Sequence, residues 1–119
     1  MFNELEWSDR VKSHFPKGRG FLGAQVGLGW HPIVEDLVKE LGDLTPDFTI
    51  IQVKEKFGDL RFYSMLEDSD IDSDDYYNII TKYEHKAAKT CEYCGAPGEA
   101  REGSWYKTLC LDCYEDTRR

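Results

Sequence analysis

An α+β fold, with helices packed on a β-hairpin that forms a small antiparallel sheet, is predicted by three features of the sequence. Apolar residues recur at helical spacing in three segments. Two runs rich in β-branched and aromatic residues, FTIIQV and LRFYSM, flank a short Phe-Gly-Asp turn, which indicates the hairpin. The last quarter of the chain contains two C-x2-C pairs, typical of a small ribbon or knuckle built on four cysteines.

Three helices are expected before the cysteine pairs. The first spans residues 3–15, where three large apolar residues recur every fourth position and form one stripe. These are Trp7, Val11 and Phe15. The second spans 31–41, with Pro32 in its first turn and Gly42 placed as a C-terminal cap. The third spans 72–89 and follows the acidic run 67–75, because acidic side chains favour a helix N-terminus.

The hairpin is expected over residues 48–66, and its side chains should alternate between two faces. Strict alternation places Ile51 and Val53 on one face of the first strand. The opposite face then carries Ile50, Gln52, Lys54 and Lys56. On the second strand, Arg61 and Tyr63 share one face, and Leu60 and Phe62 share the other.

The four cysteines predict a zinc site. Cys91, Cys94, Cys110 and Cys113 have the spacing C-x2-C-x15-C-x2-C, which lets two pairs of sulfurs converge on one tetrahedral ion. Disulfides or a redox C-x-x-C are the competing interpretations, and the absence of an export signal disfavours disulfides. Four sulfur ligands close the coordination sphere, so one structural Zn²⁺ is expected. The chain should therefore divide into an α+β domain, 1–89, and a zinc-binding tail, 90–119, packed on it.

Several functional classes are disfavoured by composition. No apolar run is long enough for a membrane span, and the start MFNELEWSDR has no secretory signal, so a cytoplasmic protein is expected. The net charge of −8 disfavours non-specific binding to duplex DNA. The run EDSDIDSDD lacks the glycine and terminal glutamate of a calcium loop, and GRGFLG lacks the strand and helix of a dinucleotide site. No catalytic constellation is visible, so we expect no enzyme.

One face of the hairpin collects basic and aromatic side chains. The candidate partner-binding residues are Gln52, Lys54, Lys56, Arg61 and Tyr63. Interleaved cations and aromatic rings on a sheet can hold a phosphate or stack a base. We favour the other interpretation, in which Lys54 and Lys56 pair with nearby acids such as Asp59 or the run 67–75, because charged runs are usually solvated faces.

Two segments carry a resemblance. QVKEKFGDLRFY (Gln52–Tyr63) and the tail CEYCGAPG…GSWYKTLCLDC (Cys91–Cys113) resemble small proteins of bacteriophages and prophages, over roughly residues 29–113. The resemblance implies a phage-type accessory protein in the cytoplasm of a bacterial host, and it implies no reaction. We therefore expect a non-enzymatic interaction module that engages or inhibits a host defence protein through its acidic surface. A nucleic-acid or nucleotide binder that uses the basic hairpin face is the alternative.

Overall fold

The computed structural model describes residues 4–14, 23–102 and 106–117, and its fold is α+β, as predicted. The main body contains two helices and a hairpin between them, preceded by a short helix. In chain order these elements are α1 (Glu4–Lys12), the 3-10 turn η1 (Leu28–Trp30), α2 (His31–Leu44), β1 (Phe48–Lys56), β2 (Asp59–Leu66) and α3 (Ser73–Ala87). The cysteine-bearing end adds β3 (Glu99–Arg101), β4 (Lys107–Leu109) and α4 (Leu111–Thr117).

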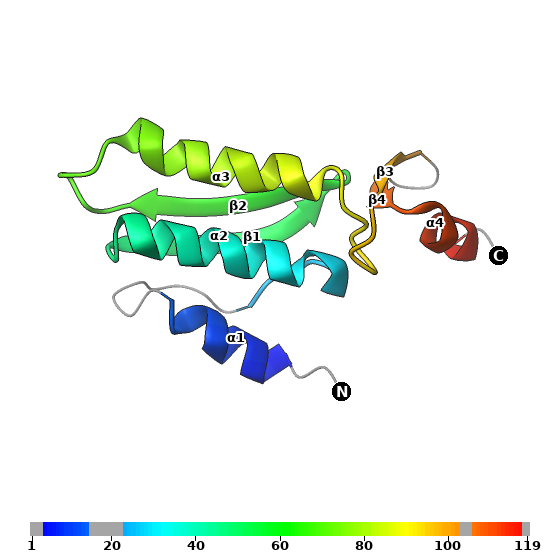
Figure 1. The fold of residues 1–119 in the computed structure, drawn as a ribbon, viewed down its shortest axis with the longest axis horizontal. Helices are drawn as coiled ribbons and strands as arrows, with labels where there is room; N and C mark the ends of the chain where they lie inside the picture. The colour runs from blue at the N-terminus through cyan, green and yellow to red at the C-terminus, as the bar shows by residue number, and fades with distance from the viewer. Residues whose placement is uncertain (1–3, 15–22, 103–105, 118–119) are drawn as a thin grey trace.

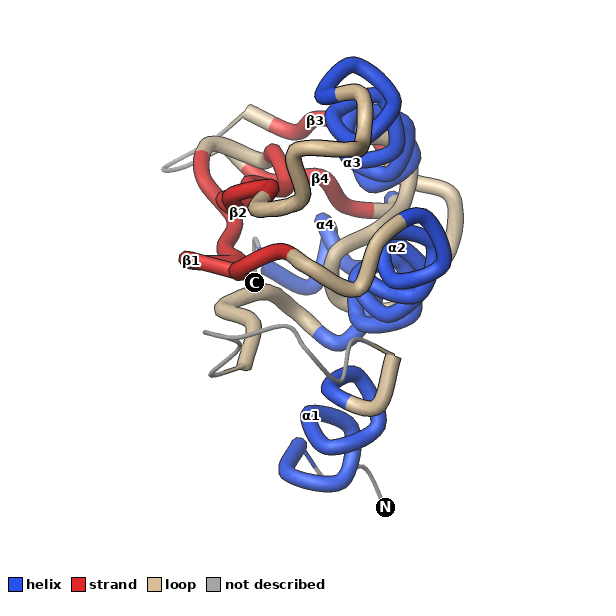
Figure 2. Tube along the Cα trace, turned by 90° about the vertical axis from the view of Figure 1, so that its left-hand side faces the viewer, coloured by secondary structure: helices blue, strands red, loops and turns tan. Residues whose placement is uncertain are grey.

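The helices cover one face of the hairpin. α2 and α3 run along the β1–β2 sheet, and α1 lies beside α2 (Figure 1). Seen from the end, both strands lie to one side of the two helices, so no described helix covers the other face of the sheet (Figure 2). The small β3–β4 sheet and α4 lie beyond the turn of the hairpin (Figure 1). This arrangement leaves one sheet face open and places the cysteines beside the hairpin turn.

The core lies between the helices and the covered sheet face. Trp30 and Tyr76 are its largest fully buried side chains, and Phe48 lies beside the Tyr76 ring with 6.0 Å between centroids. The apolar face of α2 is buried along its length, which confirms the periodicity seen in the sequence. Its members are Ile33, Val34, Leu37, Val38 and Leu41. Burial of these side chains is the main source of stability for a body of this size.

The predicted alternation along β1 is wrong because the strand contains a β-bulge. The register shifts between Ile50 and Gln52, so one extra residue is inserted into the first strand. As a result Ile50 and Val53 both face the core with 1% of their surface exposed, whereas Ile51 is 60% exposed. The bulge leaves Gln52, Lys54 and Lys56 on the open face, as expected from the sequence.

Helix α2 is longer than predicted. It continues through Gly42 to Leu44, and Thr45 is its C-cap in an extended conformation (φ −156°). The Thr45 N–H donates to the Leu41 carbonyl (2.8 Å), and the Thr45 hydroxyl donates to Asp68 and accepts from the Asp47 N–H. These bonds end the helix, so Gly42 is not needed as the cap.

The helix predicted over 3–15 is observed as α1, Glu4–Lys12. Trp7 and Val11 are buried as expected, and the Trp7 ring stacks on His31 with 4.0 Å between centroids. Phe15 and most of GRGFLG lie outside the described residues. The predicted third helix is α3, where the Asp72 carboxylate accepts the Asp74 N–H (2.8 Å) and caps the first turn.

The hairpin turn consists of Phe57 and Gly58, both with positive φ (53° and 83°), which is the conformation of a type I′ turn. Such turns suit right-twisted strands but strongly prefer asparagine or glycine at the first position. Phe57 is instead a bulky aromatic residue in a conformation that side chains rarely adopt, and it is 68% exposed. The turn therefore presents an aromatic ring to solvent at a cost in backbone strain.

Candidate metal centre and the open hairpin face

Four sulfur atoms converge at the end of the hairpin. The Sγ atoms of Cys91, Cys94, Cys110 and Cys113 all lie within 4.8 Å of one another. All four cysteines are free thiols, so no disulfide joins them. The first pair follows α3, and the second pair lies at the end of β4 and in the first turn of α4. Antiparallel pairing of the intervening strands β3 and β4 brings the two cysteine pairs together, as the sequence spacing predicts.

The spacing of the sulfurs fits a tetrahedral zinc ion. With Zn–S bonds of about 2.3 Å, a regular tetrahedron separates its sulfurs by about 3.8 Å. Cys94 Sγ and Cys110 Sγ are 3.6 Å apart, and the rest of the cluster stays within 4.8 Å. Four thiolates this close repel one another, so a dication is the partner that allows all of them to ionise. The four residues could hold one metal ion, and Zn²⁺ is compatible with the set.

Local electrostatics already favour a thiolate at the buried ligand. Burial raises the pKa of Cys91, but backbone N–H groups of Cys110, Cys94 and Tyr93 outweigh burial and lower that pKa to about 6. Burial, together with hydrogen bonds to the neighbouring sulfurs, raises the pKa of Cys113 instead. These opposite shifts make Cys91 a stronger acid than Cys113.

Glycines allow the cysteine loop to approach the main body closely. A Cβ added at Gly29 would lie 2.2 Å from the Cys91 carbonyl oxygen and 2.5 Å from the Gly95 nitrogen. Gly95 follows the first cysteine pair with φ +85°, a conformation that favours glycine. The Gly29 N–H also donates to the Glu92 carbonyl (2.8 Å). The backbone of η1 thus packs directly on the loop that carries the first two sulfurs.

Three charged side chains connect the cysteine module, residues 90–117, to the hairpin. Lys107 Nζ donates to Glu55 Oε1 (3.0 Å) and to Glu92 Oε1 (3.2 Å). Only 3% of the Glu92 side chain is exposed, and its other oxygen accepts the Gly27 N–H (3.0 Å). Glu55 Oε2 accepts the N–H of Gly58 in the hairpin turn (2.7 Å). Each carboxylate therefore has both a cation and a backbone donor, as buried charges require.

Neutral hydrogen bonds add to this contact. The buried Thr108 hydroxyl donates to the Gly58 carbonyl in the hairpin turn (2.7 Å). The Trp30 indole N–H donates to the Thr90 carbonyl, immediately before the first cysteine (2.8 Å). Neither the lysine–glutamate network nor these bonds could be predicted from the sequence, because they join residues 15 to 60 positions apart.

The five hairpin residues singled out from the sequence form one surface. Gln52 pairs with Tyr63 across the ladder, Lys54 pairs with Arg61, and Lys56 pairs with Asp59. These three pairs alternate along the ladder with pairs that face the core; they point away from the helices, and we call them the open hairpin face. Arg61 Nη2 contacts Asp59 Oδ2 at 3.5 Å. Among residues 4–14, 23–102 and 106–117, neither Lys54 nor Lys56 forms an ion pair, so the expected pairing of these lysines with acids is not found there.

Phe57 is a feature of this surface that the sequence analysis missed. The sequence predicts only that Phe57 lies in the turn, and the signal for its role is a phenylalanine at a turn position where asparagine is preferred. Lys56 Nζ lies 5.8 Å from the Phe57 ring centroid, and Lys54 Nζ lies 5.9 Å from the Tyr63 ring centroid. Both contacts are cation–π pairs on the hairpin. Ile51 and Met65 add exposed apolar surface further from the turn.

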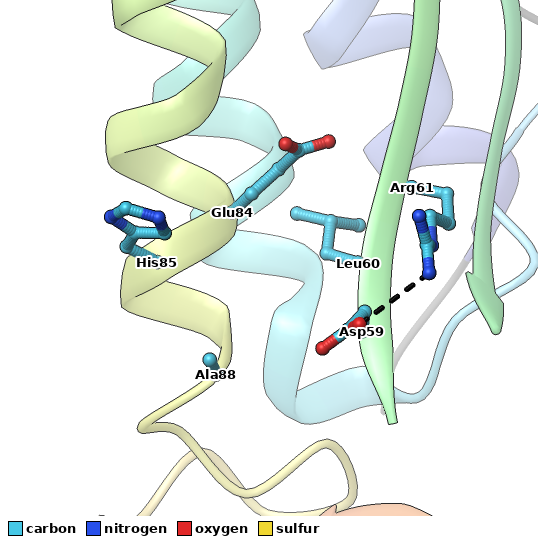
Figure 3. A pocket seen from close by; sticks show the side chains of 6 residues that line it. All are labelled: Asp59, Leu60, Arg61, Glu84, His85 and Ala88. Atoms are coloured by element: carbon cyan, nitrogen blue, oxygen red, sulfur yellow. Dashed lines mark hydrogen bonds and ion pairs between the residues drawn. The ribbon is translucent and has the colours of Figure 1, made fainter. Parts of the chain in front are cut away.

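A small pocket between β2 and α3 is lined by charged residues. Figure 3 shows Leu60 directed toward α3, whereas the Arg61 side chain lies on the opposite side of β2. The pocket measures about 200 Å³, smaller than the 300–1,000 Å³ typical of ligand sites. Glu84 accepts the Phe62 N–H (3.2 Å), and burial raises the pKa of Glu84. This carboxylate covers a main-chain donor at the edge of the sheet, which is a structural role.

Compared with known protein families, curated proteins and solved structures, the chain matches none of them. Among the described helices, none combines the length and the apolar character needed to cross a bilayer. The class of the protein is therefore defined by its own fold and site: an α+β body whose end carries four converging cysteines compatible with a zinc ion.

Proposed function

We propose that the chain is a small non-enzymatic binding module that contains one structural Zn²⁺ ion, held by Cys91, Cys94, Cys110 and Cys113. The observation that carries the proposal is the convergence of four free sulfurs at tetrahedral spacing. A tetrahedral set of four sulfurs suits zinc or an iron–sulfur centre, and two C-x2-C pairs in a short ribbon are typical of zinc. Four thiolate ligands leave no open position for a substrate, so the ion has a structural role.

Zinc would supply folding energy where the chain provides little. Among the described residues of the cysteine module, Cys91 and Leu109 are the buried apolar side chains, and α4 has no buried residue. Structural zinc contributes about 10–16 kcal/mol of apparent binding free energy, which becomes folding free energy. The ion would thereby hold Thr108 and Lys107 against the hairpin turn, where they contact Gly58 and Glu55.

Metal analysis tests this proposal. Protein purified without added zinc should contain one Zn²⁺ per chain in a native mass spectrum, and its four thiols should resist alkylation until a chelator is added. Cys91→Ser and Cys113→Ser should each lose the ion. A mass that corresponds to the bare polypeptide, or to two disulfides, in freshly purified protein would refute the proposal.

A role for the module as a phage-type accessory protein that engages a host protein is supported by the resemblance of Gln52–Tyr63 and Cys91–Cys113 to phage and prophage proteins. Electrostatics are consistent with a basic partner, because four thiolates and one dication would change the formal charge from −8 to −10. A specific complex with a host protein that dissociates at high salt would support this part of the proposal. A complex unaffected by salt would contradict it.

A further inference from the structure

The open hairpin face concentrates positive charge on an acidic protein. Its three outward pairs contribute Lys54, Lys56 and Arg61 against the single carboxylate of Asp59. Glu55 lies in the same strand but is engaged by Lys107 and the Gly58 N–H. The lysines have no carboxylate partner within the described part of the chain, so an anion from outside can approach both of them.

Two exposed aromatic rings border this charge. Tyr63 lies at one end of the three pairs and is 41% exposed, and Phe57 lies in the turn at the other end. Each ring has a lysine ammonium within 6 Å of its centroid. Phe57 keeps its exposed position despite a positive φ that disfavours it, and strain of this kind clusters at functional sites. The face therefore repeats one unit, an exposed ring beside a cation.

We propose that the open hairpin face binds single-stranded nucleic acid, with bases stacked on Tyr63 and Phe57 and phosphates paired with Lys54, Lys56 and Arg61. Aromatic rings bind unpaired bases through stacking, which is tolerant of sequence, and cations track the backbone between them. This inference rests on the proposed function, because the zinc-held module positions the hairpin turn through Thr108 and Gly58.

The dimensions of the face favour a strand over a second copy of the chain. The three pairs span five residues of β2, Asp59–Tyr63, so the face covers about 17 Å by 10 Å, or roughly 170 Å². A stable protein interface needs about 800 Å² on each partner. A single strand needs only a narrow platform, and its phosphates complement the local charge. A duplex keeps its bases stacked inside, and the overall charge of −8 repels its dense phosphates.

Fluorescence anisotropy with labelled oligonucleotides tests the inference on the full, zinc-loaded chain. The probes are oligo-dT and oligo-U of about 12 nucleotides, with a duplex of equal length, at about 50 mM salt and above. The two single strands should bind and the duplex should not. Lys54→Gln/Lys56→Gln should reduce the slope of log K against log salt by about 1.4, because each single-strand phosphate contact contributes about 0.7. The matched control, Lys12→Gln/Lys39→Gln, removes two exposed lysines from α1 and α2 and should leave the slope unchanged.

Stacking is tested separately from charge. Tyr63→Leu should weaken binding of the oligonucleotide about tenfold and leave the salt slope unchanged. The control, Tyr77→Leu, replaces a tyrosine of similar exposure on α3 and should bind as tightly as the unmutated protein. Zinc content and thermal unfolding are measured on the same samples. A folded, zinc-loaded chain that binds neither single strand would overturn this inference and leave the zinc proposal intact. The inference would also be overturned if the hairpin variants and their controls lost the same amount of binding affinity. Displacement of the oligonucleotide by an acidic peptide at a similar concentration would overturn it as well.

Discussion

Replacing Lys107 by methionine should destabilise the protein severely, because the substitution removes the cation shared by two partly or fully buried carboxylates. Lys107 Nζ lies 3.0 Å from Glu55 and 3.2 Å from Glu92, and 19% of the lysine side chain is exposed. Methionine retains most of the aliphatic volume, so the change isolates the loss of the charge.

The size of the effect follows from burial. Removing one partner of a buried ion pair costs about 3–5 kcal/mol, because the remaining charge is left in a poorly solvated site. Glu92 keeps the Gly27 N–H and Glu55 keeps the Gly58 N–H, which favours the lower end of that range, about 3 kcal/mol. For a chain of this length, that loss lowers the midpoint of thermal unfolding by about 12 °C.

Circular dichroism of zinc-loaded protein at pH 7 measures this loss. The control is Lys82→Met, which breaks the exposed pair with Glu40 and should cost less than about 1 kcal/mol. Adding Glu92→Gln to Lys107→Met should restore part of the stability, because the orphaned charge is then removed. If Lys107→Met lowers the free energy of unfolding no more than Lys82→Met does, the buried network does not stabilise the contact between the cysteine module and the hairpin.

The pH dependence of the same variant gives an independent check. Burial lowers the pKa of Lys107, but the carboxylates of Glu55 and Glu92 outweigh burial and raise it above its usual value. A raised lysine pKa contributes stability that is complete below the unfolded-state pKa of about 10.4 and is lost as the pH rises through the folded-state pKa. Above pH 10, the free energy of unfolding should therefore fall further in the unmutated protein than in Lys107→Met.

Three further substitutions test other parts of the fold. Phe57→Asn should raise the free energy of unfolding by about 1 kcal/mol in urea, because asparagine tolerates the positive φ of the turn. Glu84→Gln keeps an acceptor for the Phe62 N–H and should stabilise the protein at pH 7, because burial raises the pKa of Glu84 and so penalises its charged form. The gain in stability should vanish below about pH 4.3, where the glutamate is protonated in both the folded and the unfolded state. Gly29→Ala should lower the free energy of unfolding by about 3 kcal/mol and speed the loss of zinc to a chelator, because the added Cβ meets backbone atoms of the cysteine loop. The control, Gly42→Ala inside α2, should leave the stability unchanged or raise it.

Each of these substitutions has an outcome that would contradict its reasoning. A destabilised Phe57→Asn variant would show that the exposed ring contributes to folding. A Glu84→Gln variant that is less stable at pH 7 would show that the carboxylate is stabilised by its charged neighbours. If Gly29→Ala keeps its zinc and its stability, the backbones of η1 and the cysteine loop do not pack closely enough to exclude a Cβ.

Local patterns in the sequence predicted those parts of the fold that depend on near neighbours. The α2 stripe, the start of α3 after the acidic run and the hairpin strands follow from local patterns, and so does the convergence of the four cysteines. The bulge at Ile51 was not predictable, because Ile50 and Ile51 are identical residues and only the burial of Ile50 and Val53 in the folded core decides the register. Similarly, the end of α2 depends on Asp68, 23 residues after the Thr45 cap.

The surroundings of the site depend on long-range contacts that no local pattern contains. Lys107 sits between Glu55 and Glu92 because the cysteine module folds back onto the hairpin turn, and only the folded chain places these residues together. The open hairpin face was predictable in composition, since the residues alternate along two strands. Its ion pairs were not, because Asp59 contacts Arg61 in the folded hairpin and leaves Lys54 and Lys56 without a carboxylate partner among the described residues.

X-ray absorption at the zinc edge tests the central claim most directly. The bound metal of freshly purified protein should show a first shell of four sulfur atoms at about 2.3 Å, with one zinc per chain. A first shell that contains nitrogen or oxygen, or metal well below one equivalent, would contradict a closed four-thiolate centre formed by Cys91, Cys94, Cys110 and Cys113.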